Sequence, residues 1–72
     1  MDQQEIRKLQ KYLRQKFRLD TIELHKRANK DDSVEVMIGD EFIGLIYKDA
    51  EDGEVSYDFN MAILEFDLPE DA

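Results

Sequence analysis

The sequence predicts an α+β domain in which an N-terminal amphipathic helix packs on a four-stranded antiparallel meander sheet. The hydrophobic period is about 3.6 residues up to Arg18 and about 2 from Thr21 onward. The connections between the later segments are short, and no second helical pattern follows, which argues against parallel crossovers. With 72 residues, the chain is expected to form one domain, 1–72, near the lower size limit for a self-sufficient core.

The helix is predicted over residues 3–18. Its apolar stripe consists of Ile6, Leu9, Leu13 and Phe17. Asp2 is suited to be the N-cap, with Glu5 three residues on, which is the spacing of a capping box. The opposite side of the helix carries a basic face that consists of Arg7, Lys8, Lys11, Arg14 and Arg18. This face is either solvated or a docking surface for an acidic partner, whose binding would weaken with salt.

Four strands are predicted, at 21–27, 33–38, 41–48 and 54–64, and the pattern leaves open whether the tail at 65–72 is ordered. Loop lengths suggest the registers, because a turn of known length fixes the pairing beyond it. The predicted pairs include Leu24 with Val36, Val36 with Ile43, Val34 with Leu45, Tyr47 with Val55, Leu45 with Tyr57 and Ile43 with Phe59. All three hairpins then place their large apolar residues on the face that the helix covers.

The other face of the sheet, here called the free face, is predicted to be mostly polar around a shallow apolar depression. This candidate interaction face consists of Met37, Phe42, Gly44 and Ile46. Either a partner fills the depression, namely a second copy, a peptide or a small ligand, or the apolar residues of the tail cover it. Gly44 is equally compatible with a bulge or with close packing.

His25, Glu35 and Asp58 form a weak polar-site candidate on the same face. The predicted register sets His25 beside Glu35, with Asp58 roughly 10 Å further across the sheet. A histidine with carboxylates can act as a general base or bind a metal, but no Ser or Cys nucleophile accompanies it and catalytic zinc needs a third protein ligand. An exposed His–Glu pair is the simpler interpretation. No catalytic, cofactor-binding or metal site is predicted.

The stretch KDAEDGEVSYDF, residues 48–59, crowds carboxylates around one glycine as calcium loops do. An EF-hand loop needs Gly at position 6, oxygen ligands at 1, 3 and 5, and Glu at 12. With Gly53 at position 6, only Asp52 remains as a ligand, and starting from Asp49 puts Glu54 where the glycine must be. The loop is better explained as a turn in which Asp52 and Gly53 supply positive φ. Whether the acids of 49–54 have a further role is left open.

Charge is distributed unevenly along the chain. Residues 1–30 carry nine Lys/Arg and four Asp/Glu, a net charge of +5, whereas residues 31–72 carry Lys48 and fourteen acids, a net charge of −13. The overall charge of −8 argues against general binding of nucleic acid or anionic membranes. The chain has no cysteine, which excludes disulfides and thiolate zinc sites, and no long apolar segment, so we expect a cytoplasmic protein.

The motifs KDDS, IGDEFIG, EDGE and MAIL lie between Lys30 and Leu64, after a basic N-terminal helix. In these motifs the chain resembles a family of small bacterial, in particular alphaproteobacterial, proteins of unknown function. The resemblance implies a single small cytoplasmic domain. It brings no activity, cofactor or catalytic residue.

The sequence therefore predicts a non-enzymatic protein-interaction module without a cofactor, bound to itself or to an unknown protein partner. Two alternatives stay open. One is a small-ligand or metal binder that uses His25, Glu35 and Asp58, and the other is docking of the basic helix face on an acidic partner.

Overall fold

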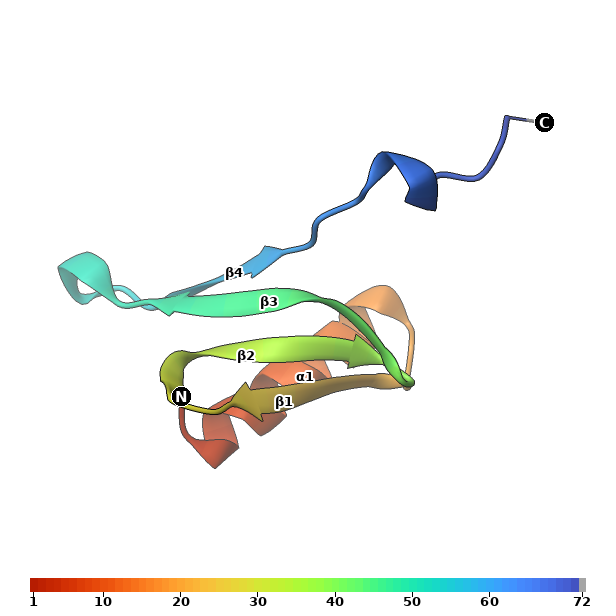
Figure 1. Cartoon of the computed structure of the whole chain (residues 1–72). Helices are drawn as coiled ribbons and strands as arrows, with labels where there is room; N and C mark the ends of the chain where they lie inside the picture. Colours follow the sequence, from red (N-terminus) through yellow and green to blue (C-terminus); the bar gives the residue numbers. More distant parts are fainter. Residues whose placement is uncertain (72) are drawn as a thin grey trace.

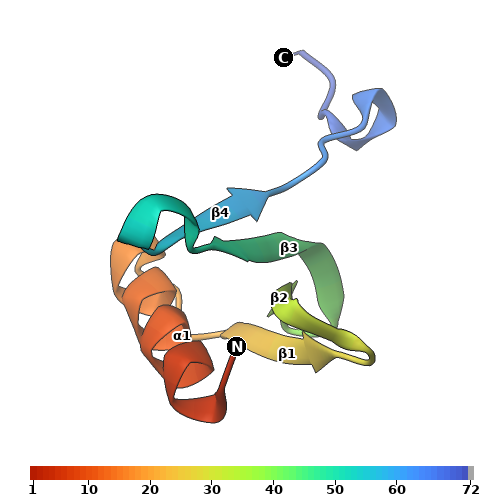
Figure 2. The same ribbon diagram turned by 90° about the vertical axis from the view of Figure 1, so that its left-hand side faces the viewer.

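The structure, a computed structural model, describes residues 1–71, apart from the side chains of Lys30 and Asp31. Its elements are α1 (Gln3–Phe17), β1 (Ile22–Arg27), β2 (Lys30–Ile38), β3 (Glu41–Asp49), the 3₁₀ turn η1 (Glu51–Gly53), β4 (Ser56–Asn60) and the 3₁₀ turn η2 (Glu65–Asp67). The strands form one antiparallel sheet in the order β1-β2-β3-β4, with α1 across one face (Figures 1 and 2). The predicted fold class is confirmed. The prediction for the tail extends to Ala72, which lies outside the described residues.

Helix α1 begins with the predicted capping box. Asp2 Oδ1 accepts a hydrogen bond from the Glu5 N–H at 2.7 Å, and Glu5 Oε1 accepts one from the Asp2 N–H at 3.3 Å. The helix ends where Arg18 adopts a left-handed backbone, with φ 54°, and donates its N–H to the Arg14 carbonyl. The predicted end at residue 18 is therefore one residue too late.

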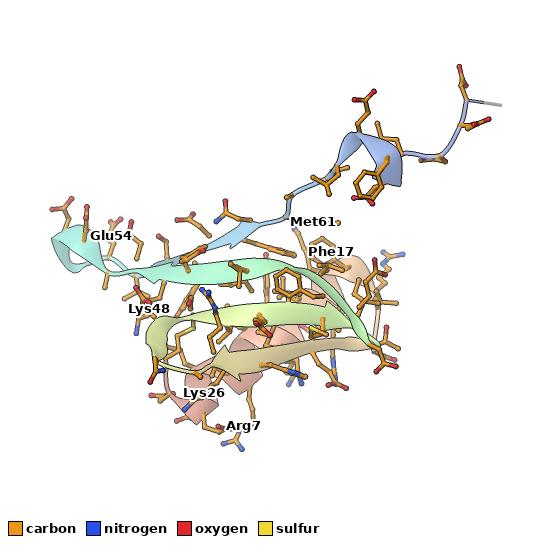
Figure 3. The ribbon with its side chains drawn as sticks, in the orientation of Figure 1. Arg7, Phe17, Lys26, Lys48, Glu54 and Met61 are labelled. Carbon is orange, nitrogen blue, oxygen red and sulfur yellow. The ribbon has the colours of Figure 1, made fainter. Side chains whose placement is uncertain are left out.

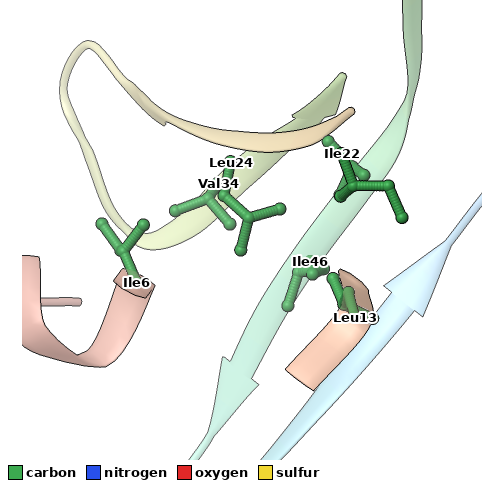
Figure 4. Close-up of a cluster of buried hydrophobic side chains, with 7 residues drawn as sticks. Ile6, Leu13, Ile22, Leu24, Val34 and Ile46 are labelled. Atoms are coloured by element: carbon green, nitrogen blue, oxygen red, sulfur yellow. The ribbon is translucent and has the colours of Figure 1, made fainter. Parts of the chain in front are cut away.

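A small hydrophobic core lies between α1 and the sheet (Figure 4). Its buried residues are Ile6, Leu13, Ile22, Leu24, Val34, Val36 and Ile46. The alternation of buried and exposed residues along β1 is what a sheet with one covered face requires.

The β1–β2 hairpin has the predicted register but a different loop. Leu24 pairs with Val36, as predicted. The expected five-residue loop is a turn at residues 28–29, where Asn29 has φ 62°, and β2 begins at Lys30 rather than at 33. The register of the pair shifts between Lys26 and Arg27, which accommodates the longer β2. The pairs further from the turn therefore remain as predicted.

The β2–β3 hairpin contains a β-bulge that corrects the predicted faces of β3. Past the turn at residues 39–40, Met37 pairs with Phe42, but Val36 then pairs with Gly44 instead of Ile43. One extra residue reverses the side on which the following side chains lie. Ile46, predicted on the free face, is therefore 2% exposed in the core, whereas Tyr47, predicted in the core, is 39% exposed.

The β3–β4 register differs from the prediction by three residues. Ile46 pairs with Phe59 and Lys48 with Tyr57, so the predicted pairs of β4 with Ile43, Leu45 and Tyr47 are wrong. The physical reason is the connection, which contains η1 and runs over residues 50–55, so that β3 extends to Asp49 and β4 begins at Ser56 rather than at 54. Asp52 and Gly53 do supply positive φ there, at 57° and 77°. The register shift of β4 and the bulge in β3 each reverse the face of the sheet on which a side chain lies, and the two reversals cancel. Tyr57 and Phe59 therefore pack against the core, as predicted.

Strand β4 ends at Asn60, four residues before the predicted end at 64. The chain that follows, residues 61–71, is here called the tail, and it projects away from the sheet (Figures 1 and 2). As a result the molecule is elongated, with extents of 47 × 24 × 23 Å. Within residues 1–71, no helix has the length and apolar character to cross a membrane.

Candidate functional site

An apolar groove of about 440 Å³ lies between α1 and the β3–β4 side of the sheet. Its lining comprises Leu9, Tyr12, Leu13, Lys16, Phe17, Ile46, Tyr57 and Phe59. Four of the eight are aromatic, and Lys16 brings the only formal charge to the lining. The groove exists because α1 contacts mainly β1, so that the helix side of β4 is only partly covered.

Sequence spacing explains how these side chains converge. Tyr12 and Lys16 are four residues apart on α1 and therefore neighbours on its surface, whereas Tyr57 and Phe59 alternate along β4 and share one face. The rings of Phe17 and Phe59 meet edge to face, with centroids 6.4 Å apart and planes at 65°. This contact joins the end of α1 to the end of β4.

The start of α1 is joined to the sheet by a polar cluster of Glu5, Lys48 and Tyr57. Glu5 Oε2 lies 2.6 Å from Lys48 Nζ and accepts a hydrogen bond from the Tyr57 hydroxyl. These bonds, first that of Lys48 and then that of Tyr57, lower the pKa of Glu5 from 4.5 to about 2. Hydrogen bonding to Glu5 also raises the pKa values of Lys48 and of Tyr57. The cluster and the aromatic pair together fix the width of the groove.

Two side chains of α1 cover the outer edge of β1. Gln10 Oε1 accepts a hydrogen bond from the Leu24 N–H at 3.0 Å, and Arg14 Nε donates one to the Ile22 carbonyl at 2.8 Å. Unpaired edges are sites where other chains add strands, and polar side chains that bond an edge reduce that hazard. In the part of the chain that is described, β4 pairs only with β3, so its outer edge stays open beside the groove.

Gly44 lets the end of β4 pack closely against β3. It is buried, and a Cβ at this position would lie 2.5 Å from the Asn60 carbonyl oxygen and 2.8 Å from Phe59 Cε1. The space left by its missing side chain is thus filled by Phe59 and the end of β4. A hollow of about 710 Å³ does lie at this end of β3, where Phe42, Gly44 and Leu45 line it together with the tail residues Met61 and Leu64. Both interpretations of Gly44, the bulge and the close packing, are confirmed.

The candidate interaction face on the free side of the sheet is only partly assembled. Met37 lies opposite Phe42, which is 53% exposed, as predicted. The bulge places Leu45 and Tyr47 on this face in place of Gly44 and Ile46. Carboxylates of Glu23, Glu35 and Asp58 share the face, so its surroundings are acidic.

The polar-site candidate is not brought together. His25 does pair with Glu35 across the strands, but its Nε2 lies 3.0 Å from Glu23 Oε1. Asp58 pairs with Tyr47, outside the row of His25, because of the register shift in β4. Among the described side chains, no group of three or more His, Cys, Asp or Glu is arranged to hold a metal ion.

The basic face of α1 is mostly solvated. Arg7, Lys8, Lys11 and Arg18 are exposed, whereas Arg14 is half-buried because it bonds the edge of β1. Arg7, Lys11 and Arg14 line a shallow hollow of about 270 Å³ together with Gln10, Gln15 and Asp20. This hollow lies on the side of α1 next to the edge of β1, whereas the groove lies on the side next to β4, so its cations are outside the groove lining.

Sequence reasoning did not identify the groove, although it placed most of its residues. Phe17, Tyr57 and Phe59 were predicted on the helix side of the sheet, and they are there. What escaped prediction is that they stay accessible at the margin of the core. The sequence did contain a signal for the groove. The predicted helix is short and has one apolar stripe, whereas the predicted sheet has four strands to be covered.

Comparison with known proteins identifies a family for this chain but no activity. No curated protein matches the chain, and no solved structure does. The model of one family matches residues 5–67, which include the four strands and η2. The chain therefore belongs to the family of proteins of unknown function DUF3126.

Proposed function

We propose that this domain is a non-enzymatic protein-binding module, which takes an apolar segment with acidic residues into the groove between α1 and β4. The observation that carries the proposal is the groove itself, which is apolar, aromatic and open. Aromatic side chains around a concave apolar surface are typical of the sites that dominate protein-binding energy. Lys16 in the lining favours a partner segment with acids.

The lining suits binding better than bond making. It offers apolar surface, one ammonium group and two tyrosine hydroxyls, of which that of Tyr57 is already bonded to Glu5. The predicted alternative, docking of the basic helix face on an acidic partner, would use the other side of α1, next to the edge of β1. The free face is a weaker candidate, since Phe42 stands among carboxylates that would repel an acidic segment.

The expected partner is a protein rather than nucleic acid or a membrane, because the net charge of the chain is −8. Cytoplasmic location and alphaproteobacterial origin stay predictions from the sequence.

Selection from a displayed library of short peptides tests the proposal. The bait is the full chain with Phe66→Ser and Leu68→Ser, here called the tail variant, in which the chain's own apolar segment cannot compete. We expect enrichment of peptides in which two or more large apolar residues are interleaved with Asp or Glu. Binding should fall about tenfold or more when salt is raised from low to high concentration.

The control bait adds Tyr12→Ser and Lys16→Glu, two exposed positions of the groove, to the tail variant. A matched control adds Lys8→Glu, which makes the same charge change on α1 outside the groove lining. Enriched peptides should lose binding to the first bait and keep most of it with the second. Equal enrichment on all baits, or none on any, would refute the proposed function.

A further inference from the structure

We infer that the occupant of the groove is the tail of a second copy of this chain, so that two copies exchange tails reciprocally. The inference rests on the proposed protein-binding function of the groove. The partner segment is the tail, which is apolar, acidic and exposed in the structure.

The tail is the most apolar exposed segment of the molecule. Its large residues are between 50% and 83% exposed, namely Met61, Ile63, Leu64, Phe66 and Leu68. Phe66 is the most exposed of them, and the end of the tail stands away from the sheet (Figure 3), whereas Met61 and Leu64 line a hollow of about 710 Å³ with the start of β3. Contiguous apolar surface of this kind marks an interaction site in a soluble chain.

The tail is also locally organised. In η2, Asp67 Oδ2 accepts a hydrogen bond from the Leu64 N–H at 3.1 Å, and the Asp67 N–H bonds the Leu64 carbonyl at 2.9 Å. The Leu68 N–H bonds the Glu65 carbonyl at 3.2 Å. A segment whose turn is already formed before binding loses less conformational entropy on docking than an unstructured segment does. The match of the family model extends through Asp67, so this turn belongs to the region that the family model describes.

The direction of the tail favours a second copy over the chain's own groove. The tail starts directly after Phe59 and Asn60, at one end of the groove, and runs away from the sheet (Figure 1). To enter its own groove the chain would have to reverse at once. Residues 61–64 are Met, Ala, Ile and Leu, with none of the Gly, Pro, Asn or Asp that such a reversal favours.

Charge selects the groove over the other apolar surface. The tail carries Glu65, Asp67, Glu70 and Asp71 and has no cation. The groove has Lys16 in its lining as its one charged residue, whereas the free face carries Glu23, Glu35 and Asp58. An apolar segment with acids is therefore attracted to the groove and repelled by the free face.

The exposed area is large enough for a dimer. The chain exposes 6028 Å². A compact monomer of 8.5 kDa exposes about 4,700 Å², so roughly 1,400 Å² is in excess for each copy. Stable interfaces bury about 1,200–2,000 Å² in total. Because reciprocal exchange uses the same groove and tail on each copy, it closes as a symmetric dimer.

Sedimentation velocity of the full chain from low micromolar to near-millimolar concentration is the first test. We expect a monomer–dimer equilibrium that weakens with salt, and the tail variant should dimerise at least about tenfold more weakly. Phe42→Ser is the control, because it removes an exposed aromatic ring from the free face. A chain that stays monomeric throughout, or equal loss in Phe42→Ser, would overturn the inference.

Mixing two variants tests the tail-in-groove arrangement itself. The tail variant keeps its groove, and a chain with only Tyr12→Ser and Lys16→Glu, the groove variant, keeps its tail. Each alone should be monomeric, but a mixture should form a heterodimer through the one remaining tail and groove. Absence of the heterodimer, despite dimers of the wild type, would show another interface and overturn the inference.

Peptide selection on the tail variant separates the two proposals. If peptides bind the groove while the wild type is monomeric, the protein-binding function stands and the exchange of tails does not. If neither peptides nor the tail of a second copy binds, both proposals fail.

Discussion

At the residue scale, Glu5 has two separate roles. One carboxylate oxygen completes the capping box of α1, and the other bonds Lys48 and Tyr57 on β3 and β4. A single side chain thus joins the first turn of the helix to the last two strands. The sequence indicates only the first role, because the capping box is local whereas Tyr57 lies 52 residues further along the chain.

Stability should depend on pH through Glu5. Its pKa is about 2 in the folded chain against 4.5 without these partners, so its ionised form stabilises the fold above pH 4.5. This contribution declines as the pH falls from 4.5 towards 2. Glu5→Gln, which can still cap the helix, should therefore be less stable than the wild type at neutral pH, and the difference should shrink in acid.

Urea denaturation at neutral pH and near pH 3 measures this difference. Glu41→Gln, at an exposed carboxylate at the start of β3, is the control and should alter stability little at either pH. A difference between Glu5→Gln and the wild type that stayed constant with pH would contradict the expected role of the Lys48 contact.

At the element scale, β3 decides how the sheet is assembled. Its bulge turns Ile46 into the core and Leu45 and Tyr47 out of it. Both Ile43 and Ile46 then pack on the helix side of the sheet. In a regular strand they would lie on opposite faces, because side chains alternate and the two residues are an odd number of positions apart. Gly44 lies between them and lets β4 and Phe59 approach β3 closely.

Gly44→Ala should loosen β4. A Cβ there meets the Asn60 backbone oxygen and the Phe59 ring at under 3 Å, so the end of β4 must shift, at a cost of about 1–3 kcal/mol. Denaturation and amide exchange should show lower stability and faster exchange in β4. Gly53→Ala, where a Cβ meets nothing within 4 Å, is a control for the loss of a glycine, and only its positive φ should cost stability. Unchanged exchange in β4 of Gly44→Ala would be evidence against this close packing.

At the scale of the whole molecule, the chain is more extended than its length requires. Its radius of gyration is 13.7 Å, whereas a compact chain of 72 residues has one of about 11 Å. The difference reflects the tail, which contributes apolar surface without adding to the core.

Thermal stability should therefore depend on protein concentration. If two copies exchange tails, association stabilises the folded chain, and raising the concentration to about 100 times the dissociation constant contributes about 2.7 kcal/mol. For a domain of this size that corresponds to a rise in Tm of about 10–20 °C, since about 1 kcal/mol shifts Tm by about 4–8 °C. Differential scanning calorimetry at increasing concentration measures it, and the Tm of the tail variant should stay constant. A constant Tm in the wild type would argue against dimers.

Prediction from sequence succeeded where the signal is local. The capping box at Asp2 and Glu5, the turn at residues 39–40 and the positive φ of Gly53 all follow from a few neighbouring residues. It failed at the registers of β3 and β4, because one bulged residue and one 3₁₀ turn move every later pair. The candidate sites shared this failure, since those registers assigned Ile46 to the free face. They also put Asp58, which does lie on that face, into the row of His25.

The periods of the sequence determined by themselves that one helix covers one face of a four-stranded meander, because burying an apolar stripe allows few other arrangements. Loop length alone did not determine which apolar residues of β3 lie inside. Only the tertiary structure decided that, through the space that Phe59 needs at Gly44 and the room for both Ile43 and Ile46 beneath the helix. It also decided that the groove and the tail stay accessible, because one short helix is too narrow to cover all four strands, and β4 ends before the tail can pack.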